Sequence, residues 1–302
     1  LFPEILEKAF ARAESGRPGP VLVDVPMDIF SKEIDVALWK QVQLNARTVR
    51  KPSLDDETAE KIVRQLLAAK TPVLYVGGGI LLADAAEEMR EFAERLSLPV
   101  AHTLMGKGAL PDDHPLILGM TGFWGTKFIN DKCKGADWIL GLGTRFSEAD
   151  CSSWENEYTF SFPPTKLIQI DIDPSEIGRN YPVAIGAVAD LKQALEVLNR
   201  VARKLAPKGV KRDKLLAEMD RNGVGEQFPI YTPGSIFTPG GFATMGFGSP
   251  AALGAKVALP DRVVVALIGD GGFGQNPAAL ATAFEEDIAV VWVIMNNHAF
   301  GT

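Results

Sequence analysis

Short apolar runs alternate with amphipathic segments of helical period through the middle of the chain, and this alternation limits the fold more than any other feature. Strands are predicted at residues 72–76, 99–102, 138–142, 166–172 and 183–188. Helices are predicted near residues 83–96, 126–134 and 191–205, and another opens at Ser53-Leu54-Asp55-Asp56, which resembles a capping box with Asp in place of Glu. Alternation of this kind predicts an α/β fold, in which a parallel sheet carries helices on both faces.

The last segment of the chain repeats this pattern. A small-residue helix is predicted at 250–258, a strand at 263–268, a helix at 277–284 and a second strand at 289–295. The last three elements form a strand–helix–strand unit, whose strands are parallel and whose crossover is expected to be right-handed. Both strands are almost purely apolar, and we expect both to be buried.

The front of the chain and one internal segment fit this pattern poorly. Apolar residues at helical spacing predict a helix over residues 2–13, and a buried strand is predicted at 21–25. One helix and one strand cannot bury a core, so we expect their packing partners to lie upstream of residue 1. Residues 206–240 hold no element long enough to pack, so this segment reads as a linker or as a place where sequence is missing.

Composition excludes two classes of protein. The net charge of the 302 residues is −7, whereas a nucleic-acid binder needs clustered positive charge. The longest wholly apolar run, residues 288–295, is far shorter than the ~20 residues that span a bilayer. No secretory leader is evident, and Cys133 and Cys151 fit no metal spacing, so we expect a cytoplasmic protein with two reduced thiols.

Polar clusters follow both strands of the last unit. Gly269-Asp270-Gly271-Gly272-Phe273 comes after the first strand, and Asn296-Asn297 comes after the second. The carboxyl ends of neighbouring parallel strands meet at one edge of a sheet, where open α/β sheets bind ligands. Glycines let backbone N–H groups approach a phosphate, and a carboxylate with an amide oxygen suits Mg²⁺. Each cluster alone is also typical of a plain turn, but the pair predicts a diphosphate held through a metal.

These clusters and several other motifs resemble the thiamine diphosphate-dependent 2-oxo acid decarboxylase and carboligase superfamily, and most of all the acetolactate synthase large subunit. The matching segments are GDGGF with MNN, residues 244–255 (TMGFGSPAALGA), 103–108 (TLMGKG), 118–120 (LGM), 143–146 (GTRF), 170–174 (IDIDP) and 15–26 (SGRPGPVLVDVP). The resemblance implies a Rossmann-like central domain with a parallel sheet, flanked by parts of two thiamine diphosphate-binding α/β domains. It covers nearly the whole chain except residues 206–240.

The resemblance also implies a domain organisation. Its parts are the tail of an N-terminal pyrimidine-binding domain at 1–33, a linker at 34–51, the central domain at 52–205, the linker or incomplete segment at 206–240, and the first part of the diphosphate- and Mg-binding domain at 241–302.

Site roles carry over at the residues that match the family motif. The carboxylate of Asp270, the side chain of Asn297 and the backbone carbonyl of Ala299 would bind Mg²⁺. Gly271 and Gly272 would present N–H groups to the diphosphate. Gly246 and Gly269 would line the cofactor, and Met245 would be the apolar wedge that folds it into a V, although simple core packing also explains a methionine there. The activating glutamate belongs to the family's first domain and has no candidate in this chain.

A second cofactor is suggested by the central domain. Acetolactate synthases bind FAD there, whereas related enzymes bind another adenine nucleotide or none. The residues that match this site are Met120, Gly143, Arg145, Asp171 and Asp173. The alternative for Arg145 is an ordinary surface ion pair.

The implied function is decarboxylation of a pyruvate-like 2-oxo acid and ligation of the resulting enamine to an acceptor carbonyl, by a homodimer or homotetramer. This reaction would make the protein a transferase. The alternative within the same superfamily is a lyase-type enzyme, a decarboxylase or C–C hydrolase that releases its product without ligation. Ala278-Ala279-Leu280, where the family usually has Gln-Glu-Leu, leaves the substrate open. The alternatives outside the class are a non-catalytic nucleotide-binding subunit and a degenerate scaffold.

Overall fold

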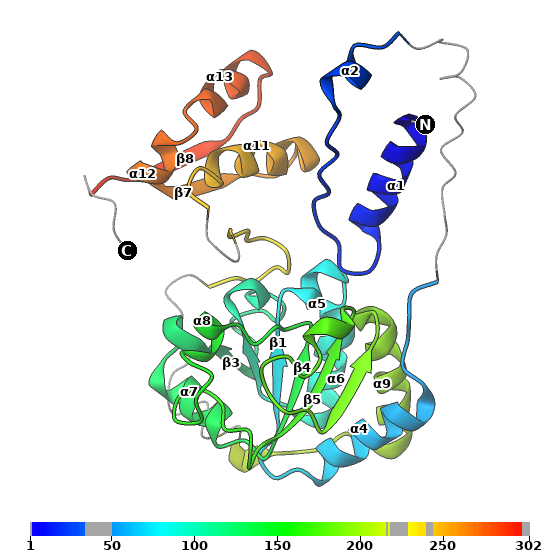
Figure 1. The fold of residues 1–302 in the computed structure, drawn as a ribbon. Helices are drawn as coiled ribbons and strands as arrows, with labels where there is room; N and C mark the ends of the chain where they lie inside the picture. Colours follow the sequence, from blue (N-terminus) through cyan, green and yellow to red (C-terminus); the bar gives the residue numbers. More distant parts are fainter. Residues whose placement is uncertain (1, 34–49, 216, 218–228, 240–243, 298–302) are drawn as a thin grey trace. The chain divides into compact units, whose positions relative to one another are not determined.

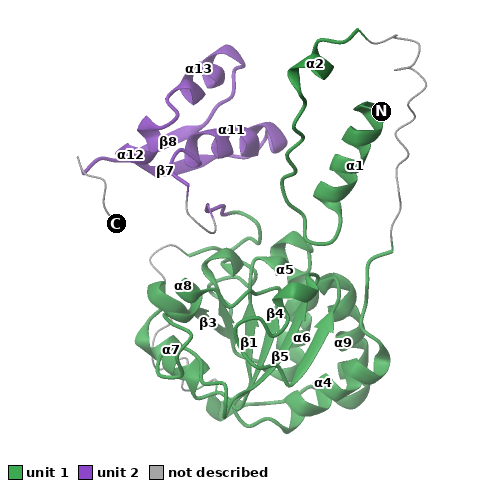
Figure 2. Ribbon diagram, in the orientation of Figure 1, with its two compact units in different colours: residues 1–235 green, residues 236–302 purple. Residues whose placement is uncertain are grey.

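The chain divides into two compact units, residues 1–235 and 236–302 (Figure 2). The structure is a computed structural model that describes residues 2–33, 50–215, 217, 229–239 and 244–297 (Figure 1). We describe each unit by itself.

A six-stranded parallel sheet forms the centre of the first unit. Its strands lie in the order β3-β2-β1-β4-β5-β6 (Figure 1). Their bounds are β1 Val73–Val76, β2 Val100–His102, β3 Ile117–Met120, β4 Trp138–Leu142, β5 Lys166–Asp171 and β6 Ile185–Val188. This order is that of the doubly wound dinucleotide-binding sheet, and it confirms the predicted Rossmann-like central domain.

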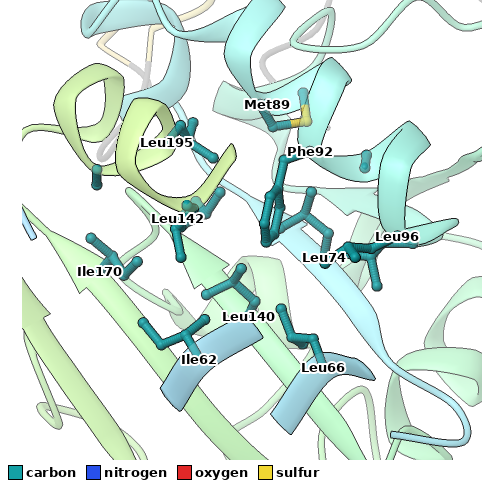
Figure 3. Packing of buried hydrophobic residues seen from close by; sticks show 14 of the residues in the cluster. Ile62, Leu66, Leu74, Met89, Phe92, Leu96, Leu140, Leu142, Ile170 and Leu195 are labelled. Atoms are coloured by element: carbon teal, nitrogen blue, oxygen red, sulfur yellow. The ribbon is translucent and has the colours of Figure 1, made fainter. Parts of the chain in front are cut away.

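Three long helices cover one face of this sheet: α4 (Asp56–Ala68), α6 (Ala86–Leu96) and α9 (Leu191–Leu205). Figure 3 shows how their apolar side chains meet those of β1, β4 and β5, with Phe92 and Leu195 on the helix side and Leu140 on the sheet side. All three side chains are fully buried. At roughly 1.5–3 kcal/mol for each large side chain, this layer supplies much of the folding free energy of the unit.

The opposite face is covered by α7 (Lys127–Lys134) and by a cluster of aromatic rings rather than by long helices. The rings are those of Tyr75, Phe146, Phe160, Phe162 and Tyr181, with centroids 4.8–6.2 Å apart. Cys133 and Cys151 are buried in the same cluster and are free, as predicted. Burial raises the pKa of both thiols, that of Cys151 to about 12.

The helix α4 begins later than the sequence predicted. Asp55, and not Ser53, is its N-cap residue, and the Asp55 carboxylate accepts a bond from the Thr58 N–H at 2.7 Å. The Ser53 hydroxyl instead donates to the carbonyl of Gln193 at 3.3 Å. The helix predicted near residues 83–96 is α6 (Ala86–Leu96), which begins three residues later, and the short α5 (Gly79–Leu82) before it was not predicted.

The front of the first unit contains α1 (Phe2–Glu14), as predicted, and α2 (Met27–Phe30). The strand predicted at residues 21–25 is wrong, since this segment has no regular structure and Leu22 is 91% exposed. A strand needs a neighbour that accepts and donates its backbone hydrogen bonds, and no strand of the described sheets pairs with this segment.

One helical turn and one anchored residue lie in the long segment after the sheet. Residues 213–215 form a helical turn, and Ile230 is held by Asp112, whose carboxylate accepts the Ile230 N–H at 2.5 Å and whose own N–H donates to the Ile230 carbonyl at 2.9 Å. The Lys107 ammonium lies 3.1 Å from that carboxylate, and both side chains are buried. Part of the 206–240 segment therefore packs. The domain boundaries stay a prediction.

The second unit contains α11 (Gly248–Ala258), β7 (Val265–Gly269), α12 (Asp270–Gly274), α13 (Ala278–Glu285) and β8 (Val291–Met295). β7 and β8 are parallel, as predicted. Their predicted burial holds only for alternate residues of β7, where Ala266 and Ile268 are buried while Val265 and Leu267 are more than half exposed. It is wrong for β8, in which no residue is buried. α11 and α13 pack against buried residues on one side of these strands only. None of the helices in the described ranges is long and apolar enough to cross a membrane.

Candidate functional site

The register of β7 and β8 brings the two polar turns of the second unit to one edge. Gly269 is the partner of Met295, the last residue of each strand. Asp270 follows Gly269 directly, and Asn297 lies two residues beyond Met295. Both side chains therefore leave the sheet at its carboxyl edge, on adjacent strands, which is the juxtaposition that the sequence predicted.

The backbone at Asp270 turns at once from strand to helix. Gly269 is extended, with φ −69° and ψ 153°, and Asp270 is the first residue of α12. Gly271 and Gly272 therefore lie in the first turn of this short helix, where N–H groups have no intrahelical acceptor. Asp270 is half-buried and Asn297 is exposed.

The loop that carries Met245 contacts the end of α12. Gly246 has a φ of +86°, which disfavours any residue with a side chain, and a Cβ placed there would lie 3.0 Å from Cβ of Gln275. Gln275 is the residue that ends α12. Met245, next to this contact, is 50% exposed and is not packed into a core. Simple core packing therefore does not account for this methionine.

The donor set at this edge fits a hard divalent cation. A carboxylate and an amide oxygen are ligands that Mg²⁺ prefers. Within the described ranges no three His, Cys, Asp or Glu side chains gather as a metal site, so a metal here would depend on Asp270 together with neutral oxygen ligands. Ala299, the third predicted ligand, lies outside the described residues.

The five residues predicted for a second cofactor all lie at the carboxyl edge of the six-stranded sheet. Met120 ends β3, Gly143 and Arg145 follow β4, and Asp171 ends β5 with Asp173 two residues on. The order of the strands reverses between β1 and β4, and ligands of doubly wound sheets bind at such a point.

Arginines and carboxylates both lie at this edge, and Arg17 pairs with Glu176 at 3.0 Å and with Asp173 at 3.9 Å. Arg145 is exposed and forms no salt bridge within the part of the chain that the structure describes, so the surface ion pair considered for it is not found there. Burial raises the pKa of Asp171, and Glu176 adds to the rise. Asp173 accepts bonds from the Ser175 hydroxyl and N–H, which lower its pKa.

The glycines after β1 serve the protein's own packing. A Cβ on Gly77 would lie 2.2 Å from the carbonyl oxygen of Gly143, and one on Gly79 would lie 2.7 Å from the Gly143 Cα. The N–H of Gly77 donates to Leu142 at 3.0 Å and that of Gly79 donates to Gly143 at 3.2 Å. These two donors are therefore engaged by the β4 loop.

Sequence reasoning missed Asp150, which joins three loops at this edge. Its carboxylate accepts from the Leu104 N–H at 3.4 Å and the Ser147 hydroxyl at 2.5 Å, and its carbonyl accepts from the Thr121 hydroxyl at 2.9 Å. Two of these partners lie far away in the sequence, so no local pattern could reveal the role.

Comparison with known proteins agrees with this geometry in both units. Residues 59–198 match the central domain of the thiamine pyrophosphate enzymes, and residues 222–302 match their C-terminal TPP binding domain. The chain belongs to the thiamine pyrophosphate enzymes. Thiamine pyrophosphate is the thiamine diphosphate that the motif predicted.

Relatives within the thiamine pyrophosphate enzymes include acetolactate synthases and a glyoxylate carboligase. The chain is 34% identical to a probable acetolactate synthase large subunit of Methanococcus aeolicus over 99% of its own length and 59% of the relative's. It is 36% identical to the chloroplastic acetolactate synthase of Arabidopsis thaliana over 99% of its length and 50% of the relative's. It is 40% identical to the glyoxylate carboligase of Escherichia coli O157:H7 over 69% of its length and 34% of the relative's.

The chain thus spans about half to three fifths of the length of the acetolactate synthase relatives. The alignments with these two relatives are 360 and 345 residues long, whereas this chain has 302 residues. The acetolactate synthase relatives therefore hold residues inside the matched region that have no counterpart in the 302 residues of this chain.

Proposed function

We propose that the protein carrying this chain is a thiamine diphosphate- and Mg²⁺-dependent carboligase. It would decarboxylate a 2-oxo acid such as pyruvate and join the remaining fragment to an acceptor carbonyl. The observation that carries the proposal is the pairing of Gly269 with Met295, which sets Asp270 and Asn297 at one edge of a parallel sheet. The family membership of both domains and the names of the relatives support it.

Each residue of the site has a separate role in this proposal. Asp270 supplies the negative charge that holds Mg²⁺, and Asn297 supplies a neutral oxygen ligand. Gly271 and Gly272 present backbone N–H groups to the diphosphate, and Gly269 joins the end of β7 to the first turn of α12 that carries them. Met245, exposed on its loop, supports the cofactor from its apolar side. When bound, thiamine diphosphate supplies the electron sink for the loss of CO₂.

The subunit arrangement belongs to the same proposal. The activating glutamate has no candidate in this chain, so the complete site needs the family's first domain. We propose that this domain comes from a second copy, which makes the protein at least a homodimer. A decarboxylase or C–C hydrolase without ligation is the alternative reaction on the same site.

Product analysis of the full-length protein tests the reaction. With pyruvate, thiamine diphosphate and Mg²⁺ we expect release of CO₂ together with a ligated 2-hydroxy-3-oxo acid, here acetolactate. The glyoxylate carboligase relative makes glyoxylate the second substrate to test. CO₂ release with free aldehyde and no ligated product would favour the decarboxylase. Turnover that is unchanged when thiamine diphosphate is withheld would reject the proposal.

We further propose that the carboxyl edge of the central sheet binds FAD. Arg145, which is exposed and forms no salt bridge with the residues that the structure describes, fits a phosphate group, and the buried Asp171 at the end of β5 fits a ribose hydroxyl. Because the N–H groups of Gly77 and Gly79 are engaged, the phosphates would depend on Arg145 rather than on the glycine turn.

The absorption spectrum of the full-length protein tests this second proposal. A flavin band that is retained through purification and lost in an Arg145→Ala variant is the expected result. If the protein is colourless but binds ADP, the proposed ligand changes from FAD to another adenine nucleotide. If the protein binds neither FAD nor ADP, the proposal of a nucleotide site at this edge is rejected.

A further inference from the structure

The loop that follows β4 is strained at one residue. Phe146 has a φ of +50°, in the left-handed region, where a residue with a bulky side chain is rarely found. Such a conformation costs free energy and persists only where the surrounding structure fixes it, and residues of this kind cluster at functional sites. Phe146 directly follows Arg145, which is exposed at the carboxyl edge of the central sheet. The contacts that hold Phe146 therefore also set the backbone at Arg145.

Packing fixes the Phe146 side chain. It is 2% exposed, and its ring centroid lies 5.2 Å from that of Tyr75, 5.4 Å from that of Phe160 and 5.6 Å from that of Tyr181. The ring would lose these contacts if the backbone relaxed to an ordinary φ, and their loss would cost free energy. The aromatic cluster thus offsets part of the strain.

Side-chain donors fix the backbone of the same turn. The Asn180 amide nitrogen donates to the carbonyl of Arg145 at 3.0 Å and to the carbonyl of Phe146 at 3.1 Å. The indole N–H of Trp154 donates to the same Phe146 carbonyl at 2.8 Å. The two carbonyls that Asn180 bonds lie on either side of the Phe146 Cα, so this one amide restrains both backbone dihedral angles of the strained residue.

Arg145 is held at its backbone and exposed at its side chain. Its carbonyl is bonded to Asn180, and its guanidinium forms no salt bridge with the residues that the structure describes. A cation on a fixed backbone loses less conformational entropy when it binds an anion than a cation on a mobile loop does. The turn is therefore organised for an anion that the described residues do not supply.

We propose that Asn180 is the positioning residue for Arg145, because its amide holds the carbonyls on both sides of the strained Phe146. Without this amide Phe146 relaxes towards a negative φ, and the Arg145 side chain leaves the position from which it meets a phosphate. Asn180 needs no contact with the ligand, since it acts through Arg145. The proposal rests on the nucleotide site proposed above, in which Arg145 binds a phosphate group.

Calorimetry with ADP tests the proposal on the full-length protein after removal of any bound flavin. Arg145→Ala, which removes the phosphate contact itself, is expected to weaken ADP binding roughly 10–100-fold. Asn180→Ala is expected to weaken it about tenfold. Because Asn180 acts through Arg145, the two losses should not add, and N180A/R145A should bind ADP within about twofold of R145A.

The outcomes separate this role from the nucleotide site itself. Parental affinity in N180A, or a fully additive loss in N180A/R145A, would overturn the positioning role and leave the nucleotide site in place. A parent protein that binds neither ADP nor FAD, or an R145A protein that binds ADP as tightly as the parent, would reject the nucleotide site at Arg145 and this role with it.

Asn199 gives the matched control. Its amide nitrogen donates to the carbonyl of Glu88 at 2.8 Å, so Asn199→Ala also removes a bond from an asparagine to a carbonyl, but between α9 and α6. It is expected to lower the melting temperature and to leave the ADP affinity unchanged. Equal losses of ADP affinity in N199A and N180A would show general destabilisation and overturn the proposal.

Hydrogen exchange gives a readout that needs no ligand. The Phe146 N–H donates to the Thr144 hydroxyl at 3.3 Å, a bond within the strained turn. N180A should speed exchange at this N–H, whereas N199A should not. Parental exchange there in N180A would show that the turn keeps its conformation without the Asn180 amide, and would overturn the positioning role.

Discussion

Replacing Asp270 by asparagine in the full-length protein is expected to lower kcat/KM for a 2-oxo acid roughly a thousandfold. Asp270 is the charged ligand of the proposed metal site, and asparagine keeps its shape while it removes the negative charge. A bound metal supplies several kcal/mol of charge stabilisation and orientation, and each ~1.4 kcal/mol corresponds to a tenfold change in rate. Steady-state rates at saturating thiamine diphosphate and increasing Mg²⁺ measure the effect.

An exposed aspartate in the same unit gives the matched control. Asp261 lies in the turn between α11 and β7, away from the carboxyl edge, and Asp261→Asn is expected to leave kcat/KM unchanged. Calorimetry with thiamine diphosphate and Mg²⁺ separates lost binding from lost folding, because D270N should keep the parental melting temperature. A D270N protein that turns over within threefold of the parent would remove Asp270 from the site.

The central domain is the part of the fold that sequence reasoning predicts best. The run Trp138–Leu142 is apolar apart from Gly141. It forms β4 in the centre of the sheet, buried on both faces. Leu191–Leu205 is predicted to the residue, since Asp190 caps α9 by accepting the Gln193 N–H and the apolar side chains recur at helical spacing. In both elements the local signal and the tertiary environment agree.

Elements whose state depends on distant neighbours were not predictable. β3 (Ile117–Met120) is short and contains Gly119 at a φ of +109°, so its sequence does not look like a strand, and β2 supplies its hydrogen bonds. At residues 21–25 the error is the opposite one. This mostly apolar run predicts a strand, but no strand in the described sheets pairs with it. The exposed face of β7 shows the same limit, because alternation in burial is set by what covers a strand and not by its own residues.

The candidate sites also contain some features that local sequence predicts and others that depend on long-range contacts. The position of Asp270 and Asn297 beyond the carboxyl ends of adjacent strands follows from the topology of one strand–helix–strand unit, so the sequence was enough to predict it. The contacts of Asp150 and of Gly77 come from residues 29 to 75 positions away. Such long-range contacts appear only when the sheet is assembled, and the glycines after β1 read from sequence as a generic turn.

The second large effect is expected from Gly77→Ala, which should destabilise the central domain by about 2–4 kcal/mol. The new Cβ would lie 2.2 Å from the Gly143 carbonyl oxygen and 2.8 Å from the Thr144 Cα, both backbone atoms that cannot rotate away. Overpacking typically costs ~1–3 kcal/mol. The shift would also break the hydrogen bond from the Gly77 N–H to Leu142, for about 1 kcal/mol more.

Urea unfolding followed by tryptophan fluorescence measures this loss, with Trp138 of β4 as a reporter inside the affected sheet. The control is the same substitution where space is open. Gly254 lies within α11, and a Cβ there would meet nothing within 4 Å, so Gly254→Ala should leave the central transition unchanged and stabilise its own unit by up to ~1 kcal/mol. Because natural domains are stable by only about 5–15 kcal/mol, G77A should lower the urea midpoint sharply. A midpoint equal to that of G254A would show that the β1 and β4 loops separate at little cost, and that their close approach does not hold the sheet together.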